Sequence, residues 1–222
     1  MKYSKELPVY TKGEEIFNAV SHIVGGGFGV AALVLGVIFS CIYSDAYGLA
    51  SMIVLGISLI LLYTMSAIYH FLHPNRAKKL FRIFDHCTIF VLIAGTYTPY
   101  CLVTLRESGN VGWIIFSLVW GFSILGIIAN AINMHHPLIK ILSMVCYIAL
   151  GWCIIFAIKP LLANLALGGF LLLLFGGISY TIGAIFYGFG KKCKYIHSIW
   201  HLFVVIGSIL HFLSILFYVI IN

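Results

Sequence analysis

Two histidines in a strongly apolar segment have the spacing best suited to chemistry in this chain. His197 and His201 are four positions apart, and Ser198, Ile199 and Trp200 lie between them. On a helix this spacing places both imidazoles on one face, about 6 Å apart, where they can bind one metal ion. Because a polar group at membrane depth is costly, such a pair indicates a functional site. We therefore expect further ligands at the same depth.

The composition of the chain predicts that these histidines lie inside a membrane. Hydrophobic residues make up 62% of the 222 positions and charged residues 9%, and the mean hydropathy is +1.10. A soluble domain is about 45–50% apolar and about 25% charged. We therefore predict an all-α bundle of seven transmembrane helices, each needing about 20 residues to cross the bilayer. The predicted spans are 18–43, 47–72, 82–104, 111–132, 138–158, 164–187 and 196–220.

The domain organisation follows from the short connections between these spans. We predict one seven-span membrane domain over residues 1–222, with a short cytoplasmic segment over residues 1–17. The first apolar run exceeds the roughly 7–15 residues of a signal-peptide core, so we expect it to be retained. The six cysteines form no Cys-x-x-Cys pair, which favours packing roles over disulfides.

Lysine and arginine are concentrated at the N-terminus and in every second loop. By the positive-inside rule, this asymmetry predicts a cytoplasmic N-terminus and an extracytoplasmic C-terminus. The net charge of +7 then reflects topology and contact with anionic lipid. We expect no nucleic-acid partner.

With the orientation assigned, polar residues of three spans fall at one depth near the cytoplasmic side. The second span ends with Ser66 and His70, one turn apart on the same face. Asp85 lies about one turn into the third span, and the His197–His201 pair opens the seventh. Apart from Arg82 and Lys140, which lie at the cytoplasmic ends of their spans, and Lys159 just beyond the fifth span, Asp85 is the only charged side chain within a predicted span.

Three histidines at one depth predict a zinc site. Three imidazoles leave the fourth tetrahedral position of zinc open to water, the pattern of catalytic zinc. No glutamate lies between His197 and His201, so the base of a zincin-type protease is missing. Asp85 is the candidate for general base and then general acid. Ser66 is expected to orient His70 or to stabilise a developing oxyanion.

Each of these residues also fits a purely structural role. Any one of the three histidines alone fits a hydrogen-bonded residue at a helix end, Asp85 fits a partner of Arg82 one turn away, and Ser66 fits an ordinary helix contact. The convergence of all of them at one depth favours the metal site.

Three further histidines are weighed against the same site. We expect His86 to point away from the face of Asp85. His22, with Asn18 one turn before it and Glu14 two turns before, is expected to line the site entrance or to bond a ligand histidine. His211 lies roughly 15 Å beyond His201 along its helix, so it cannot bind the same ion.

The order of these motifs carries a family resemblance over essentially the whole chain. The Ser66-x-x-x-His70 pair, Asp85 and the His197-x-x-x-His201 pair resemble the signature of the hemolysin III family, the progestin and adipoQ receptors and the alkaline ceramidases. The similarity is greatest to the bacterial hemolysin III branch. That branch is indicated by two segments, Glu14-Glu15-x-x-Asn18-x-x-Ser21-His22 and Asp85-His86 through Ala94-Gly95-Thr96-Tyr97-Thr98-Pro99.

This resemblance implies a seven-helix zinc protein of the bacterial plasma membrane. It implies His70, His197 and His201 as zinc ligands, Asp85 and Ser66 as the catalytic pair, and hydrolysis of amide lipids in the eukaryotic relatives. We expect a metal-dependent hydrolase of a lipid amide or ester, with a membrane lipid of the inner leaflet as substrate or ligand. The alternatives are a sensor or receptor with a structural zinc, and a pore-forming haemolytic protein.

Overall fold

The computed structural model describes residues 7–134, 136–189 and 194–221, and these form helices without any strand. Seven helical segments are long and apolar enough to cross a membrane, which confirms the predicted fold class. The α-helices are α1 (Lys12–Tyr43), α2 (Ala46–Phe71), α3 (Arg76–Pro99), α4 (Val111–Asn133), α5 (Pro137–Gly151), α6 (Ile158–Asn164), α7 (Leu167–Phe189) and α8 (Ile196–Ile215). Shorter segments are the π-helical η1 (Tyr100–Thr104) after α3, the 3-10 helix η2 (Cys153–Ala157) after α5, and the π-helical η4 (Leu216–Ile220) after α8.

Three predicted boundaries are wrong. The third helix begins at Arg76 and not at residue 82, because the Asn75 side chain caps its first turn. The first helix begins at Lys12 and not near residue 18, because Thr11 and Glu14 form a capping box that starts it inside the segment predicted as a tail. The fifth span does not stop before Pro160 but continues through α6 to Asn164. Pro160 is tolerated because it lies in the first turn of α6, where its missing N–H would have no helical partner.

Side chains at the helix ends explain why the connections can be so short. The Asp45 carboxylate accepts hydrogen bonds from the backbone N–H groups of Tyr47 and Gly48, at 2.9 and 3.1 Å, and caps the start of α2, so only two residues separate α1 from α2. Asn75 accepts from the backbone N–H of Lys78 at 2.8 Å and starts α3. Each cap satisfies donors that the first helical turn leaves unpaired.

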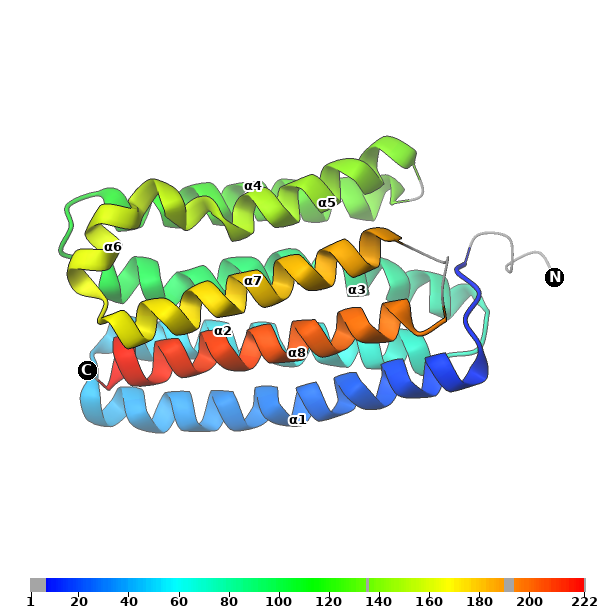
Figure 1. The fold of residues 1–222 in the computed structure, drawn as a ribbon, viewed down its shortest axis with the longest axis horizontal. Coiled ribbons are helices and arrows are strands. Elements are labelled where there is room, and N and C mark those ends of the chain that lie inside the picture. Colours follow the sequence, from blue (N-terminus) through cyan, green and yellow to red (C-terminus); the bar gives the residue numbers. More distant parts are fainter. Residues whose placement is uncertain (1–6, 135, 190–193, 222) are drawn as a thin grey trace.

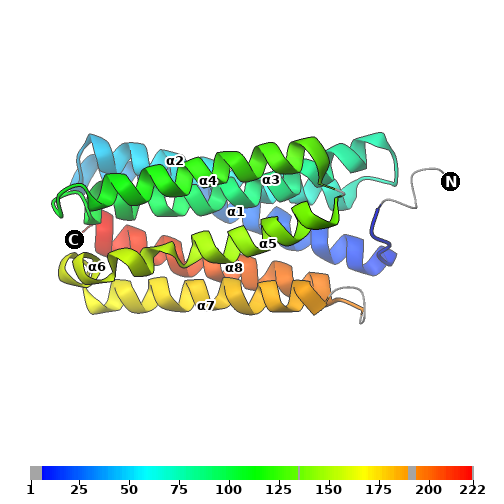
Figure 2. The same cartoon turned by 90° about the horizontal axis from the view of Figure 1, so that it is seen from above.

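The long helices run side by side along the longest axis of the molecule (Figure 1). The start of α1, the end of α2, the start of α3 and the start of α8 all lie at one end, and α8 ends at the other. Helices α4 and α5 lie on the opposite side of the bundle from α1, and the turned view separates α7 and α8 from α2 and α4 (Figure 2). The three helix ends that carry the predicted site therefore meet at one end of the bundle, together with the start of α1.

Close approach of α1 and α2 depends on glycine. A Cβ atom on Gly25 would lie 2.5 Å from the Tyr63 ring, and one on Gly29 would lie 3.1 Å from the backbone nitrogen of Ile60. Small residues of this kind let helices associate in lipid, where apolar surface alone gives no preference for protein over lipid.

The break between α5 and η2 is stabilised by a tyrosine of α3. The Tyr97 hydroxyl donates to the carbonyl oxygen of Gly151 at 3.0 Å and accepts from the backbone N–H of Ile154 at 2.9 Å. Since backbone groups inside a bilayer must be paired within the protein, this side chain makes the break tolerable.

Candidate metal centre

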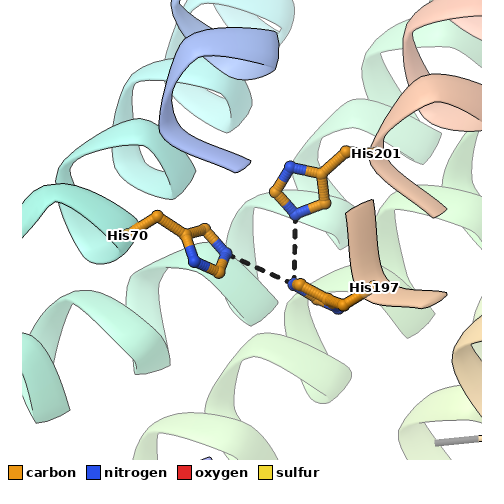
Figure 3. A group of neighbouring side chains, drawn as sticks. All are labelled: His70, His197 and His201. Carbon is orange, nitrogen blue, oxygen red and sulfur yellow. Dashed lines mark hydrogen bonds between the residues drawn. The ribbon is translucent and has the colours of Figure 1, made fainter. Parts of the chain in front are cut away.

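The three predicted ligand histidines meet at one point in the bundle. His197 Nε2 lies 3.3 Å from His70 Nε2 and 3.1 Å from His201 Nε2. The three rings point toward one another, His70 from α2 and the other two from the first turns of α8 (Figure 3). One nitrogen of each ring lies within 4.8 Å of the others, and His70 and His201 are buried. The geometry can hold a metal ion.

The far side of the His70 ring faces a carboxylate. His70 Nδ1 lies 2.7 Å from Glu15 Oε2 on α1, and Asn18 Nδ2 lies farther away, at 3.5 Å. Because a carboxylate only accepts hydrogen bonds, the shorter contact assigns the proton to Nδ1. His70 Nε2 is then left with its lone pair directed at the cluster.

His201 is oriented in the same way by backbone and hydroxyl oxygens of α1. Its Nδ1 lies 3.3 Å from the carbonyl oxygen of Asn18 and 3.3 Å from Ser21 Oγ. The Ser21 hydroxyl donates its own proton to the Asn18 carbonyl at 3.0 Å, so it accepts from the histidine. His201 Nδ1 therefore carries the proton, and Nε2 presents a lone pair.

The positions of these protons show whether the three Nε2 atoms suit a metal ion. His197 Nε2 lies between the Nε2 atoms of His70 and His201 and can donate one hydrogen to only one of them. At least one Nε2 lone pair in the cluster therefore faces a neighbouring nitrogen with no hydrogen between the two atoms. A cation bound by neutral imidazoles removes that repulsion, and the outer hydrogen bonds are those that commonly orient metal-binding histidines. The residues fit a metal ion.

Glu15 connects this cluster to a buried lysine. Its other oxygen, Oε1, accepts from Lys78 Nζ at 2.6 Å, and Lys78 also donates to the carbonyl oxygen of Leu72 at 2.9 Å. The Lys78 ammonium lies over the Tyr69 ring, 5.1 Å from its centroid, and Lys78 is only 2% exposed. The charge of Glu15 therefore has a partner on each oxygen.

The start of α8 is held against α1 just before the ligand pair. Tyr195 has a left-handed backbone with φ of 62°, which costs roughly 1–2 kcal/mol in a non-glycine residue. Glu14 Oε1 accepts from the Tyr195 backbone N–H at 2.8 Å, while Oε2 accepts from Thr11. Tyr10 stacks on the His197 ring with centroids 5.1 Å apart. These contacts determine where α8 begins and so where His197 and His201 point.

A cavity of about 180 Å³ opens beside the histidines. Asp85 and Ser66, the predicted catalytic pair, both line it together with His197 and His201. The Asp85 side chain is 14% exposed, and the Ser66 hydroxyl is buried with no hydrogen-bond partner among the described residues. The structure thus brings the two predicted groups and two of the ligands to one space, and their catalytic roles stay predictions.

Three expectations about this region need correction. His86 does not point away from Asp85, because both line the cavity and His86 Nδ1 lies 3.7 Å from Asp85 Oδ2. Adjacent helical positions are about 100° apart, but two long side chains can turn toward the same space. Ser66 does not orient His70, since Glu15 takes that position. Asp85 is also not the only charged group on a helix apart from Arg82, Lys140 and Lys159, because Glu15 and Lys78 lie on helices α1 and α3.

The polar residues on α1 differ in what they contact at the site. Asn18 contributes through its carbonyl to His201 and accepts from Ser198 Oγ at 2.6 Å. His22 lines the cavity and stacks on His201 with ring centroids 3.7 Å apart, but neither of its ring nitrogens has a partner among the described residues. It therefore bonds no ligand histidine there. Glu14 binds the turn before α8 and not a histidine.

Sequence reasoning gave Glu15 no role in the site beyond its place in the family resemblance, and it missed Lys78. A signal for Glu15 exists, because it precedes Asn18 by three positions and His22 by seven, the spacing of one helical face. Extending the first helix by two turns would have revealed it. Lys78 has no such signal, since its local sequence is that of a basic loop.

Comparison with known proteins assigns the chain to a family. A family model described as Haemolysin-III related matches residues 10–212. The chain belongs to that family. It is 45% identical over 206 residues to Hemolysin-3 of Bacillus cereus, covering 93% of this chain and 92% of the relative. It is 40% identical over 210 residues to the Hemolysin-3 homolog of Bacillus subtilis (strain 168), covering 95% and 96%.

A more distant relative comes from animals. The human Monocyte to macrophage differentiation factor is 24% identical over 198 residues, which cover 84% of this chain and 77% of the relative. The seven apolar helices and the bacterial relatives together identify a multi-pass protein of the bacterial cell membrane.

Proposed function

We propose that this protein is an intramembrane zinc hydrolase that cleaves a lipid amide or ester at the cytoplasmic leaflet. The observation that carries the proposal is the convergence of the three Nε2 atoms, each within 3.3 Å of a neighbour. Imidazole nitrogen suits zinc, and three protein ligands with a fourth position open are typical of catalytic zinc. A structural zinc would call for four protein ligands, and only three histidines form the cluster among the described residues.

In this proposal, the metal and the protein side chains have separate roles in hydrolysis. Zinc held by His70, His197 and His201 supplies Lewis-acid polarisation of a carbonyl and lowers the pKa of water. Asp85 lines the same cavity and can take a proton from the attacking water and return it to the leaving group. The unpartnered Ser66 hydroxyl can donate to the substrate carbonyl oxygen as charge develops on it.

The walls of the cavity support a lipid as substrate. Beyond the polar groups, its lining includes Leu62, Ile89, Met144, Trp200 and Val204. Such a wall stabilises an acyl chain by removing apolar surface from water. A small polar metabolite would gain little from it.

Zinc content of the purified protein tests the metal site. We expect about one zinc per chain in the wild type, as three histidine ligands predict, and none in His201→Ala. His211→Ala is the matched control, since His211 lies on the same helix but outside the cluster. A wild type that is free of zinc by elemental analysis would overturn the proposal.

Lipid turnover tests the chemistry. Asp85→Asn is expected to keep its zinc and to lose hydrolysis, because the amide cannot act as a base. The assay is untargeted lipid analysis of membranes that contain no added protein, the wild type or Asp85→Asn. If no lipid class changes although zinc is bound, a receptor or sensor with a structural zinc replaces the hydrolase. Protein-dependent conductance in planar bilayers would instead favour a pore-forming haemolytic protein, and the relative from Bacillus cereus carries the name Hemolysin-3.

A further inference from the structure

The cavity beside the histidines carries an excess of positive charge. Its charged lining residues are Arg82 on α3, Lys140 on α5 and the single anion Asp85. Arg82 is only 9% exposed, so its guanidinium is largely shielded from bulk water. A divalent ion on the histidines would increase the excess further. In a medium of low dielectric constant, this excess favours a ligand that brings negative charge.

A buried amide in the same cavity has a donor to offer. Asn130 is 1% exposed and lines the cavity from α4. Its Oδ1 accepts from Ser143 Oγ at 3.0 Å, which directs the amide, and its Nδ2 has no hydrogen-bond partner among the described residues. A buried donor without a partner is destabilising, because it loses its hydrogen bonds to water and gains none in the protein. An acceptor oxygen of a ligand would relieve this cost.

The space next to this group of donors is apolar. A second cavity of about 90 Å³ shares Leu62, Ile89, Met144, Tyr147, Trp200 and Val204 with the first. It continues along the bundle toward His211, which is ten residues beyond His201 on α8, roughly 15 Å along the helix axis. A ligand could therefore place its head in the first cavity and one chain in the second.

We propose that the lipid bound here carries an anionic head, of phosphate type, held by Arg82, Lys140 and the Asn130 amide next to the histidine cluster. Arginine and lysine provide charge-assisted hydrogen bonds to phosphate oxygens, and Nδ2 of Asn130 adds a neutral one. The assignment rests on the proposed function only in treating the cavity as the substrate site. It specifies an anionic single-chain amphiphile and disfavours a neutral lipid.

Ligand-induced stabilisation of the full-length protein in a neutral maltoside detergent tests this proposal. The probes are dodecyl phosphate, dodecylphosphocholine with the same chain but no net charge, and inorganic phosphate. Thermal unfolding is followed as each is titrated, since a ligand that binds the folded state raises the unfolding temperature. Asp85→Asn with zinc bound is measured in parallel, so that binding is read without turnover and a failed hydrolase does not hide a real anion site.

We expect dodecyl phosphate to bind the wild type at least about tenfold more tightly than either other probe, as loss of one charged hydrogen bond would predict. Equal binding of dodecylphosphocholine would overturn the proposal, because the head would not be recognised by its charge. Equal binding of inorganic phosphate would also overturn it, since the site would then serve a free anion and not a lipid.

Three variants locate the binding. Lys140→Gln removes an exposed cation at the cavity mouth and is expected to weaken dodecyl phosphate about tenfold. Asn130→Asp keeps the acceptor for Ser143 but adds negative charge, and it should weaken binding further. Lys12→Gln removes an exposed lysine from the same end of the bundle and should change nothing. If Lys12→Gln weakens binding as much as Lys140→Gln, general attraction to the basic surface explains the result and the cavity site is wrong.

Discussion

Replacing Glu15 by glutamine separates the two roles that the structure gives this carboxylate. One oxygen lies 2.7 Å from His70 Nδ1 and the other 2.6 Å from Lys78 Nζ. Glutamine has nearly the same shape and still offers one acceptor, but it removes the charge that both partners face. We expect both zinc affinity and stability to fall.

The magnitudes follow from the two contacts. Loss of an outer partner of a metal-binding histidine typically lowers metal affinity about 10–100-fold, equivalent to about 1.4–2.7 kcal/mol. Removing one member of a buried ion pair costs about 3–5 kcal/mol. Since the Glu15 side chain is 21% exposed, we expect a stability loss near the lower limit, about 3 kcal/mol.

A competitive zinc titration against a chelator gives the affinity, and denaturant unfolding of the zinc-free protein gives the stability. The double variant Glu15→Gln/Lys78→Met should recover part of the stability, because no unpaired ammonium remains, while zinc affinity stays low. Glu107→Gln, at an exposed loop position, is the control for a lost negative charge. If Glu15→Gln loses stability but binds zinc like the wild type, the carboxylate serves only Lys78 and our assignment of the His70 tautomer is wrong.

Three further predictions concern other parts of the bundle. Tyr97→Phe removes the hydroxyl that pairs both sides of the α5 break, so its free energy of unfolding should fall by about 1–3 kcal/mol; the exposed Tyr43→Phe should leave it unchanged. Glu14→Gln should weaken the hydrogen bond from the Tyr195 backbone N–H, so amide hydrogen exchange in the turn before α8 should accelerate. Unchanged exchange would show that helix packing alone holds this turn in place. A hydrogen bond from Arg106 lowers the pKa of the Asp45 carboxyl. A carboxyl whose pKa is lowered in the folded state stabilises the protein at pH values above its ordinary pKa. This stabilisation is lost as the pH falls through the pKa of the folded state. Asp45→Asn should therefore slightly lower the unfolding temperature at neutral pH and not in strong acid, and an equal effect at both would contradict the ion pair.

The sequence by itself determined the seven helices and the common level of the three histidines along the bundle. Hydropathy is a local property, and a run of apolar residues must form a helix in lipid because its backbone has no other partners. Once the spans are known, helical spacing places His197 and His201 on one face, and His70 falls at the same level. The helix caps at Asp45 and Asn75 are equally local, and they lie at the predicted joints.

Only the tertiary structure decided which groups support the histidines and how the cavity is lined. Glu15 is 55 positions from His70 and 63 from Lys78, and no local pattern encodes a pairing between separate helices. The turn of His86 toward Asp85 and the pairing of Tyr97 across the α5 break likewise depend on which helices pack together. Helix periodicity gives the direction of a side chain to within a face, whereas hydrogen bonds require atoms within about 3 Å. That difference in precision is why the site could be located from the sequence and its supporting contacts could not.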